Sequence, residues 1–434
     1  MLKIGVVGGL GHIGLIQAVC LAKIGYKTIA YDIDKMKIEG ILKGKMPFYE
    51  EGLAELIMET INKNLLKFTS NIKDLKRADI IFICVGTPSF PNGEADLSQV
   101  YSAVEQVAEN RDSHCIVVIK STVSVGTCRK LTDNLKNKGL SERITIVSNP
   151  EFLKEGSGIK DFWNPTRIIV GSEIEQIGKE VSKLYQPQGV PVLLTSWENA
   201  EMIKLVSNAF LATKISFINE ISFLSEKAGA DIRIISKGIG LDPRINPHFL
   251  EAGVGFSGPC LEKDLKSLIY QFQKKQEKAS ILESVLQVNE RQRQRIIEKL
   301  EEQLGTLKGK KIGVLGMAFK ENTDDVRRSH SLEIVKNIIA QGGIVTVTDP
   351  CVKKPEDGGI SKEELSNVEW VESPLEAAKG KDAILILTAW EEYKKLDIDK
   401  VKEAMINPLI IDGRNLFEVE DMKAKNIHYI GVGI

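Results

Sequence analysis

The sequence predicts an α/β protein in which two Rossmann-like, doubly wound domains are joined by a central helical domain with one long helix. A glycine-rich turn follows the first apolar run at Gly9–Gly14, and a sustained helical periodicity begins at Trp197. The opening pattern of the chain then returns at Lys310–Lys320. These observations divide the 434 residues into predicted domains at 1–196, 197–304 and 305–434.

The composition is that of a globular protein. Apolar residues make up 43% and charged residues 27% of the chain, which argues against disorder and against a membrane protein. The 58 basic residues are matched by 59 acidic ones, so the charge balance does not suggest a nucleic-acid partner. The six cysteines are scattered without a C-x-x-C pair, which disfavours a disulfide framework or a metal site. The chain enters an apolar run at Lys3 with no signal-peptide pattern, so we expect a cytoplasmic protein without a membrane partner.

The first unit has the pattern of a dinucleotide site. A short apolar run, Lys3–Val7, leads into a turn with glycines at positions 9, 11 and 14, and a helical stretch follows. The next apolar run ends on Asp32, whose carboxylate can accept hydrogen bonds from both ribose hydroxyls. Because a 2′-phosphate would meet the negative charge of Asp32, we expect NAD rather than NADP.

Three further apolar runs of this unit end in polar residues. The first run, 79–85, is followed by Gly86-Thr87-Pro88. The second, 114–119, is followed by Lys120-Ser121-Thr122-Val123, and the third, 144–148, by Asn149-Pro150-Glu151. Ligands of an open parallel sheet bind outside the carboxyl ends of its strands, so these polar residues should face one crevice. Taken alone, Glu151 and Glu155 are interpreted as the solvated start of a helix.

A long helix is predicted from Trp197 to about Leu224, where apolar residues recur at three- and four-residue steps. Lys204 and Asn208 share one face of it, and Lys204 taken alone is expected to be solvated. A second helical run, 281–304, completes the helical middle. Because the long helix is apolar on more than one face, we expect a second copy of the chain to cover one side, in a homodimer or higher homo-oligomer.

A glycine-rich loop at 253–258 leads to Cys260. Pro259 suits the first position of a helix, and the leucines that follow repeat at helical spacing, so Cys260 is predicted in the first helical turn. The positive end of the helix dipole and the nearby Lys263 would stabilise a thiolate there, which favours a nucleophilic cysteine. The alternative is a cysteine buried in a core.

The last part of the chain repeats the Rossmann pattern. The run Ile344–Thr348 ends on Asp349 as the earlier run ended on Asp32. The turn before it lacks the full glycine triplet and carries Lys320, which predicts a different phosphate-bearing ligand. Strands at 383–387 and 409–411 extend the sheet. Two nucleotide-binding units around a helical, cysteine-bearing middle imply two nucleotide ligands that meet at the thiol.

With these motifs in this order, the chain resembles the UDP-glucose and GDP-mannose dehydrogenase family from end to end. The matching motifs are the first glycine turn, Val85–Pro88, Lys120–Val123, Asn149–Gly156, Asn208–Phe210, the loop at Cys260, Gly316–Lys320 and Asp412–Arg414. The resemblance implies oxidation of the C6 alcohol of a nucleotide sugar to a carboxylate with two NAD+. It also implies that the three predicted domains bind NAD, carry catalysis and dimerisation, and bind the nucleotide sugar through its UDP.

The resemblance also assigns residues. Cys260 would be the nucleophile, with Lys204 and Asp264 as its helpers, and Thr122, Glu151 and Asn208 would position water and substrate. Lys204 would stabilise an oxyanion, and either Asp264 or Glu151 would act as general base. The implied cofactor-binding residues are Gly9, Leu10, Gly11, His12, Ile13, Gly14, Asp32, Lys37, Val85, Gly86, Thr87, Pro88, Ser121, Thr122, Glu155, Lys263 and Arg327. The implied substrate-binding residues are Glu151, Phe152, Leu153, Lys154, Glu155, Lys204, Asn208, Arg244, Phe256, Ser257, Gly258, Phe319, Lys320 and Arg414.

The chain departs from the usual family pattern near the thiol. Ser257 replaces a glycine, Pro259 a serine and Glu262 a proline. Further away, Arg328 stands for glutamate in the Asp-x-Arg-Glu-Ser motif and Glu51 for a proline. These changes bear on the sugar that is accepted more than on the reaction.

The Lys263-Asp264 pair looks like the UDP-glucose and GDP-mannose branch, and Pro259 is not the histidine common in the N-acetylhexosamine branch. UDP-glucose is therefore the expected substrate, with a UDP-N-acetylhexosamine or GDP-mannose as alternatives. Two other classes are a non-catalytic regulator that binds NAD and a nucleotide sugar, and a two-electron hydroxyacid dehydrogenase. The presence of Cys260 together with Lys204, Asp264 and Glu151 disfavours the regulator, which needs no nucleophile. Cys260 and the second nucleotide-binding unit disfavour the hydroxyacid dehydrogenase, which needs neither.

Overall fold

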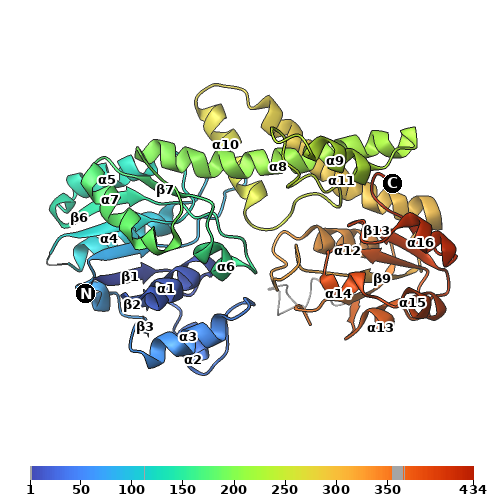
Figure 1. The fold of residues 1–434 in the computed structure, drawn as a ribbon, viewed down its shortest axis with the longest axis horizontal. Coiled ribbons are helices and arrows are strands. Elements are labelled where there is room, and N and C mark those ends of the chain that lie inside the picture. Colours follow the sequence, from blue (N-terminus) through green and yellow to red (C-terminus); the bar gives the residue numbers. More distant parts are fainter. Residues whose placement is uncertain (1, 112, 354–364, 366) are drawn as a thin grey trace. The chain divides into compact units, whose positions relative to one another are not determined.

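The computed structural model describes residues 2–111, 113–353, 365 and 367–434. The chain divides into two compact units, shown in Figure 1. The first unit comprises Met1–Ser207 and Lys266–Glu277, and the second comprises Asn208–Leu265 and Lys278–Ile434. Two helices, α8 (Trp197–Ala228) and α10 (Leu261–Lys274), contribute residues to both units.

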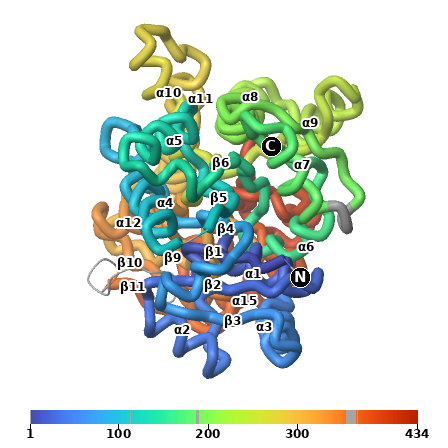
Figure 2. The backbone as a smooth tube through the Cα atoms, turned by 90° about the vertical axis from the view of Figure 1, so that its left-hand side faces the viewer, coloured from blue at the N-terminus to red at the C-terminus, as the bar shows by residue number. Residues whose placement is uncertain are grey.

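The first unit contains an eight-stranded sheet in the order β3-β2-β1-β4-β5-β6-β7-β8. Figure 2 shows its first six strands side by side, from β6 at the top to β3. All neighbouring strands are parallel except β6 and β7, which are antiparallel. The strands are β1 (Lys3–Val7), β2 (Lys27–Tyr31), β3 (Leu66–Thr69), β4 (Ile80–Ile83), β5 (Cys115–Ile119), β6 (Ile144–Ser148), β7 (Ile168–Gly171) and β8 (Val192–Thr195).

Helices cover both faces of this sheet, because successive side chains of a strand point to opposite faces and both sets are apolar here. In β4, Phe82 joins the core under α1, α3 and α6, whereas Ile81 and Ile83 join the core under α4 and α5. The helices of this unit are α1 (His12–Ile24), α2 (Lys35–Leu42), α3 (Leu53–Asn62), α4 (Ser98–Glu109), α5 (Thr127–Asn137), α6 (Gly158–Trp163) and α7 (Glu175–Ser182), with short 3₁₀ turns η1 (Ile72–Leu75), η2 (Ser141–Arg143) and η3 (Lys183–Gln188).

The second unit is built on a six-stranded sheet in the order β11-β10-β9-β12-β13-β14, in which all pairs are parallel. One apolar core joins this sheet to α11 and α12 and to the second half of α8. The strands are β9 (Lys311–Leu315), β10 (Ile344–Thr348), β11 (Val368–Trp370), β12 (Ala383–Ile386), β13 (Leu409–Asp412) and β14 (His428–Ile430). The remaining helices are α9 (Ile232–Gly240), α11 (Ser280–Leu304), α12 (His330–Ala340), α13 (Pro374–Ala378), α14 (Glu391–Lys394), α15 (Ile398–Ala404) and α16 (Val419–Ala424).

The two Rossmann-like sheets and the long helix confirm the predicted fold class, and the long helix starts at Trp197 as expected. The predicted place of Cys260 is wrong. Helix α10 begins at Leu261, and Cys260 precedes it with a carbonyl that accepts from Asp264 N at 3.0 Å. Pro259 is outside the helix because Gly258, at φ +87°, donates its N–H to the carbonyl of Arg328 and holds this segment in a loop. Among the helices of the described residues, none is long and apolar enough to cross a membrane.

Candidate active site

The turn between β1 and α1 has the geometry of a dinucleotide site. Gly14 is required by the fold itself, since a Cβ there would overlap the carbonyl oxygen of Gly8. At Gly11 a Cβ would meet only Gly8 O, at 3.5 Å, so internal packing does not explain that glycine. Asp32, at the end of β2, accepts from Leu10 N at 3.1 Å. The turn, in which Gly11 is exposed, and the Asp32 carboxylate thus lie together, which fits the phosphates and ribose of NAD.

Other predicted cofactor residues lie in the same unit. The segments that follow β4 and β5 touch each other: Thr87 Oγ1 donates to Thr122 O at 2.9 Å, and Ser121 Oγ donates to Val85 O at 2.7 Å. The His12 ring stacks on Phe48 with centroids 3.6 Å apart. Lys37 is exposed on α2, with its Nζ 3.9 Å from Asp34 Oδ2.

A buried ion pair joins Glu151, after β6, to Lys204 on α8. The Lys204 Nζ lies 2.9 Å from Glu151 Oε1, and the Leu153 N–H donates to Oε2 at 2.6 Å. Glu151 is 8% and Lys204 4% exposed. The interpretation of either residue as solvated is therefore wrong, because each supplies the charge that makes burial of the other possible. The Lys204 ammonium also lies 5.3 Å from the centre of the Phe152 ring.

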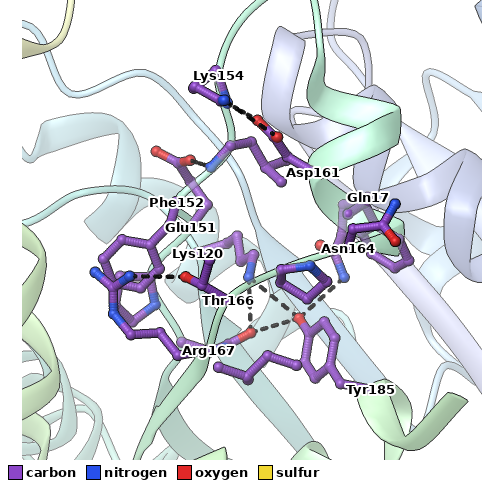
Figure 3. A pocket seen from close by; sticks show the side chains of 16 residues that line it. Gln17, Lys120, Glu151, Phe152, Lys154, Asp161, Asn164, Thr166, Arg167 and Tyr185 are labelled. Carbon is purple, nitrogen blue, oxygen red and sulfur yellow. Dashed lines mark hydrogen bonds and ion pairs between the residues drawn. The ribbon is translucent and has the colours of Figure 1, made fainter. Parts of the chain in front are cut away.

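Beside this pair is a cavity of about 170 Å³ (Figure 3), whose lining includes Lys120, Glu151 and Tyr185. Lys120 donates to Asn149 Oδ1 at 3.0 Å and to Tyr185 Oη at 3.2 Å. Burial lowers the pKa of Lys120 to about 8, while the charge of Glu151 acts in the opposite direction. On another wall, the Arg167 guanidinium stacks 4.1 Å from the Phe152 ring centre. The residues 151–154, predicted to bind substrate, thus have a polar, partly cationic surrounding.

In the second unit, Asp264 is held in the first turn of α10. Asn208 Nδ2 donates to Asp264 Oδ2 at 2.6 Å, and Lys263 Nζ donates to Oδ1 at 2.7 Å. Asp264 and Asn208 are both buried, whereas Cys260 is exposed. A fixed carboxylate therefore lies one helical turn after an accessible thiol that stands at the positive end of the helix.

The residues 253–260, which we call the cysteine loop, are held by buried side chains of the same unit. Asn219 Oδ1 accepts from Gly253 N at 2.9 Å, and Gln292 Nε2 donates to Gly253 O. Asn289 exchanges two hydrogen bonds with the backbone of Phe256, at 2.8 and 2.9 Å. His330 Nδ1 lies 2.7 Å from Val254 O.

The loop also touches residues predicted to bind the nucleotide sugar. Ser257 Oγ donates to Phe319 O at 3.4 Å, and a Cβ on Gly258 would lie 2.5 Å from the Phe319 ring. Lys320 Nζ is 5.8 Å from the centre of that ring. Arg414, after β13, donates from Nε to Leu387 O at 2.7 Å.

Two predicted arginines of the second unit are exposed. Arg244 is paired with Asp242 in its own turn and its side chain is 87% exposed. Arg327 is paired with Asp325 and its side chain is 62% exposed. The predicted roles of Arg244, Arg327 and Lys263 toward a ligand stay predictions.

Three residues around the site were not predicted, and Lys120 was predicted only as part of the polar segment 120–123 that faces a crevice. Lys120, Arg167 and Tyr185 line the cavity, and His330 contacts the cysteine loop. Lys120 carried one signal, because it is the first polar residue after a buried strand. For the other three, the contacts join distant parts of the chain, and the sequence carries no local pattern for them.

The chain matches sequence models of a single family along its length. Residues 2–188 match the NAD binding domain of the UDP-glucose/GDP-mannose dehydrogenase family, residues 198–291 its central domain and residues 313–419 its UDP binding domain. UDP-glucose 6-dehydrogenase TuaD of Bacillus subtilis is 42% identical over 436 residues, which cover 100% of this chain and 93% of that protein. The chain belongs to the UDP-glucose/GDP-mannose dehydrogenase family. It is an oxidoreductase, and its cofactor is NAD.

Two further similarities extend this result. A UDP-glucose 6-dehydrogenase of Rickettsia conorii is 39% identical over 98% of both chains. The solved structure of a UDP-glucose dehydrogenase from the hyperthermophilic archaeon Pyrobaculum islandicum covers all of this chain and 98% of its own, with a TM-score of 0.91 at 34% identity.

We predict that Lys204→Met will destabilise the protein by about 3–5 kcal/mol, because the Glu151 carboxylate would stay buried without its counter-charge. Urea unfolding measures this loss. The double variant Lys204→Met/Glu151→Gln should recover part of it. As a control, Lys179→Met removes an exposed pair with Glu175 and should leave the unfolding midpoint nearly unchanged. Equal midpoints for Lys204→Met and Lys179→Met would contradict the argument.

Proposed function

We propose that the protein oxidises the C6 alcohol of UDP-glucose to the carboxylate of UDP-glucuronate, with two NAD+ and one water per sugar. The observation that carries this proposal is the placement of Cys260. The structure describes all six cysteines, and only Cys260 is exposed, directly before the 14-residue helix α10. The positive end of a helix favours the thiolate, which is the nucleophilic form.

A thiol is needed because two hydrides leave the same carbon. NAD, when bound, accepts a hydride in each oxidation. The first oxidation removes a hydride from the alcohol carbon and a proton from its hydroxyl to give an aldehyde. The aldehyde carbon can lose its remaining hydride only after a nucleophile has added to it, because the adduct again carries a hydroxyl. The Cys260 thiolate adds to the aldehyde carbon to give a thiohemiacetal, whose oxidation gives a thioester. Water then attacks the thioester, which releases the carboxylate and regenerates the thiol.

The charged groups of the site have the chemistry for the remaining steps. We assign Lys204 to the developing oxyanion, because a fixed, buried cation stabilises it better than water does. Asp264 or Glu151 acts as general base through a water. Hydrogen bonds hold both oxygens of each carboxylate, which supports a fixed orientation. We assign Thr122 and Asn208 to positioning of water and substrate.

We assign cofactor binding to the β1–α1 turn, to Asp32 and Lys37, to the segments after β4 and β5, and to Glu155, Lys263 and Arg327. Substrate binding is assigned to residues 151–155, Lys204, Asn208, Arg244, residues 256–258, Phe319, Lys320 and Arg414. The hydrogen bond from Ser257 to Phe319 O supports the last group, because it ties the cysteine loop to the predicted nucleotide-binding turn.

The relatives favour UDP-glucose over the alternative sugars. Two UDP-glucose 6-dehydrogenases of Bacillus subtilis are 42% and 40% identical to the chain. A UDP-D-ManNAc dehydrogenase from Pyrococcus horikoshii has a similar fold, with a TM-score of 0.86, but is only 28% identical. A UDP-N-acetylhexosamine and GDP-mannose are therefore the second choices in a substrate screen.

We further propose a homodimer or higher homo-oligomer that assembles through α8. Five large apolar side chains, spaced to share a stripe on this helix, are 41–65% exposed: Met202, Val206, Phe210, Phe217 and Leu224. Arg244 would reach the substrate of a neighbouring subunit, which its exposure permits.

We also propose a cytoplasmic location, which the six free cysteines favour. For the domains we propose 1–196, 197–304 and 305–434, which the separate family matches to residues 2–188, 198–291 and 313–419 support.

Cys260 supplies the main test of the proposal. The unmodified protein should form two NADH per UDP-glucose and release no free aldehyde. Cys260→Ala should lose the overall reaction. Cys260→Ser should accumulate a covalent sugar on the peptide that contains residue 260, because its oxygen ester hydrolyses more slowly than a thioester. Mass spectrometry and NADH absorbance measure these outcomes. Cys351→Ser is the control, and normal turnover by Cys260→Ala would refute the mechanism.

Asp32 should set the choice of cofactor. We expect the unmodified enzyme to have a higher kcat/KM for NAD+ than for NADP+, and Asp32→Ala to narrow the difference at least tenfold, because the repulsion of the 2′-phosphate is removed. Asp34→Ala, which removes the N-cap of α2 two residues away, should keep the preference. Equal kcat/KM for both cofactors in the unmodified enzyme would contradict the assignment.

The α8 stripe should control assembly. Phe217→Glu places a charge in the middle of the stripe and should shift the mass measured by light scattering toward that of a single chain. Ile406→Glu changes an apolar residue outside α8 that is more exposed than Phe217, and it should leave the mass unchanged. An unmodified protein that is fully active as a single chain would rule out the assembly.

A further inference from the structure

We propose that His330 is a positioning residue, which holds the cysteine loop in its working geometry through an uncharged ring. His330 is the first residue of α12 and is 7% exposed. It lies 76 residues from its partner Val254 in the chain. The part of this inference that concerns activity depends on the proposed role of Cys260, whereas the part that concerns the loop does not.

The hydrogen bonds define the state of the ring. His330 Nδ1 lies 2.7 Å from Val254 O, and a carbonyl oxygen only accepts, so Nδ1 carries a proton. Nε2 lies 3.4 Å from Asn289 Nδ2. Asn289 accepts from Phe256 N through Oδ1 and donates to Phe256 O through Nδ2, which fixes the orientation of its amide. Nε2 therefore faces a donor and acts as the acceptor of a neutral ring.

The loop backbone lies directly on these two side chains. Gly255 has φ +93°, and a Cβ on it would overlap Asn289 Oδ1 and lie 3.2 Å from His330 Cε1. Arg328, two residues before His330, accepts the N–H of Gly258 through its carbonyl at 3.1 Å. The segment 328–330 thus contacts the loop on both sides of Phe256. Only Pro259 lies between Gly258, which donates to the Arg328 carbonyl, and Cys260.

A second proton on the ring would break this arrangement. It would turn Nε2 into a donor that points at the Asn289 amide donor. Arg293 on α11 and Arg414 after β13 oppose the added charge, and Glu262 on α10 favours it. Burial is the largest cause and lowers the pKa of His330 to about 4, although the hydrogen bond to Val254 O acts in the opposite direction.

The lowered pKa of His330 determines how the cysteine loop responds to pH. We call the loop closed when it packs on His330 and open when the ring is exposed to water. With a pKa of ~6.5 when the loop is open and about 4 when it is closed, the closed loop binds fewer protons. Closure is fully favoured above pH ~6.5 and weakens as the pH falls toward 4. Between pH 7 and pH 5 the ratio of closed to open loop should fall about 20-fold.

Two variants distinguish the hydrogen bond from the ring to Val254 from the titration of the ring. His330→Asn places an N–H at the branch position of Nδ1 and keeps a donor for Val254, but it cannot titrate. His330→Phe keeps a ring and removes both polar atoms. His428→Asn is the control, because it changes an exposed histidine on β14 of the same unit. All three should be made in the full-length protein.

Amide hydrogen exchange of residues 253–258, corrected for intrinsic rates, measures loop opening without substrate. In the unmodified protein and in His428→Asn, protection should fall about 20-fold from pH 7 to pH 5. In His330→Asn the loop should stay protected at pH 7 and should lose this pH dependence. The same 20-fold fall in His330→Asn would overturn the inference.

Activity at pH 7.5 supplies the second readout. We expect His330→Phe to lower kcat at least tenfold with KM for NAD+ changed less than twofold, and His330→Asn to keep kcat within threefold. Increased exchange of the loop in His330→Phe with an unchanged kcat would overturn the positioning role. If His330→Phe fails to fold, the pH dependence of hydrogen exchange in His330→Asn still tests the inference. A failure of the unmodified protein to oxidise any nucleotide sugar would refute the proposed function alone.

Discussion

Residues 253–256 and Gly258 are buried, and their backbone polar groups must be paired inside the protein. An unpaired buried donor or acceptor costs about 1–3 kcal/mol, so few conformations of this segment are tolerated. Its partners are buried amide side chains of α8 and α11, the His330 ring, and the carbonyls of Arg328 and Gly413. Because the loop backbone is fixed in this way, Cys260 lies at a defined position directly before α10, with its thiol exposed.

Helix α8 gives both units an oriented carboxylate. Lys204 holds Glu151 in the first unit, and Asn208, one turn later, holds Asp264 in the second. The two partners differ in chemistry. A lysine neutralises the charge of its buried acid, whereas an amide donates a hydrogen bond and leaves neutralisation of Asp264 to Lys263. One helix therefore determines the orientation of both candidate bases.

The sequence predicted what depends on local pattern. The strands that end before Gly86, Lys120 and Asn149 alternate with helices, and α8 has an unbroken apolar periodicity, so their types could be assigned. The sequence did not predict the contacts that determine which charged side chains are buried. Lys204 looked solvated because Glu151, its counter-charge, is 53 residues away, and the start of α10 depends on the bond from Gly258 to Arg328 O. His330 has no signal at all until Val254 is brought next to it.

The two Rossmann-like units carry an acid at the same place and use it differently. Asp32 accepts two backbone N–H groups and is partly exposed, so it remains accessible to a ribose. Asp349 is 1% exposed and accepts from the backbone of Met317, Ala318, Cys351 and Val352 and from the Trp390 indole. A carboxylate so occupied has no oxygen left for a ribose. Asp349 therefore stabilises the turn of the second unit from within. This explains why the repeated fold pattern does not make a second NAD site.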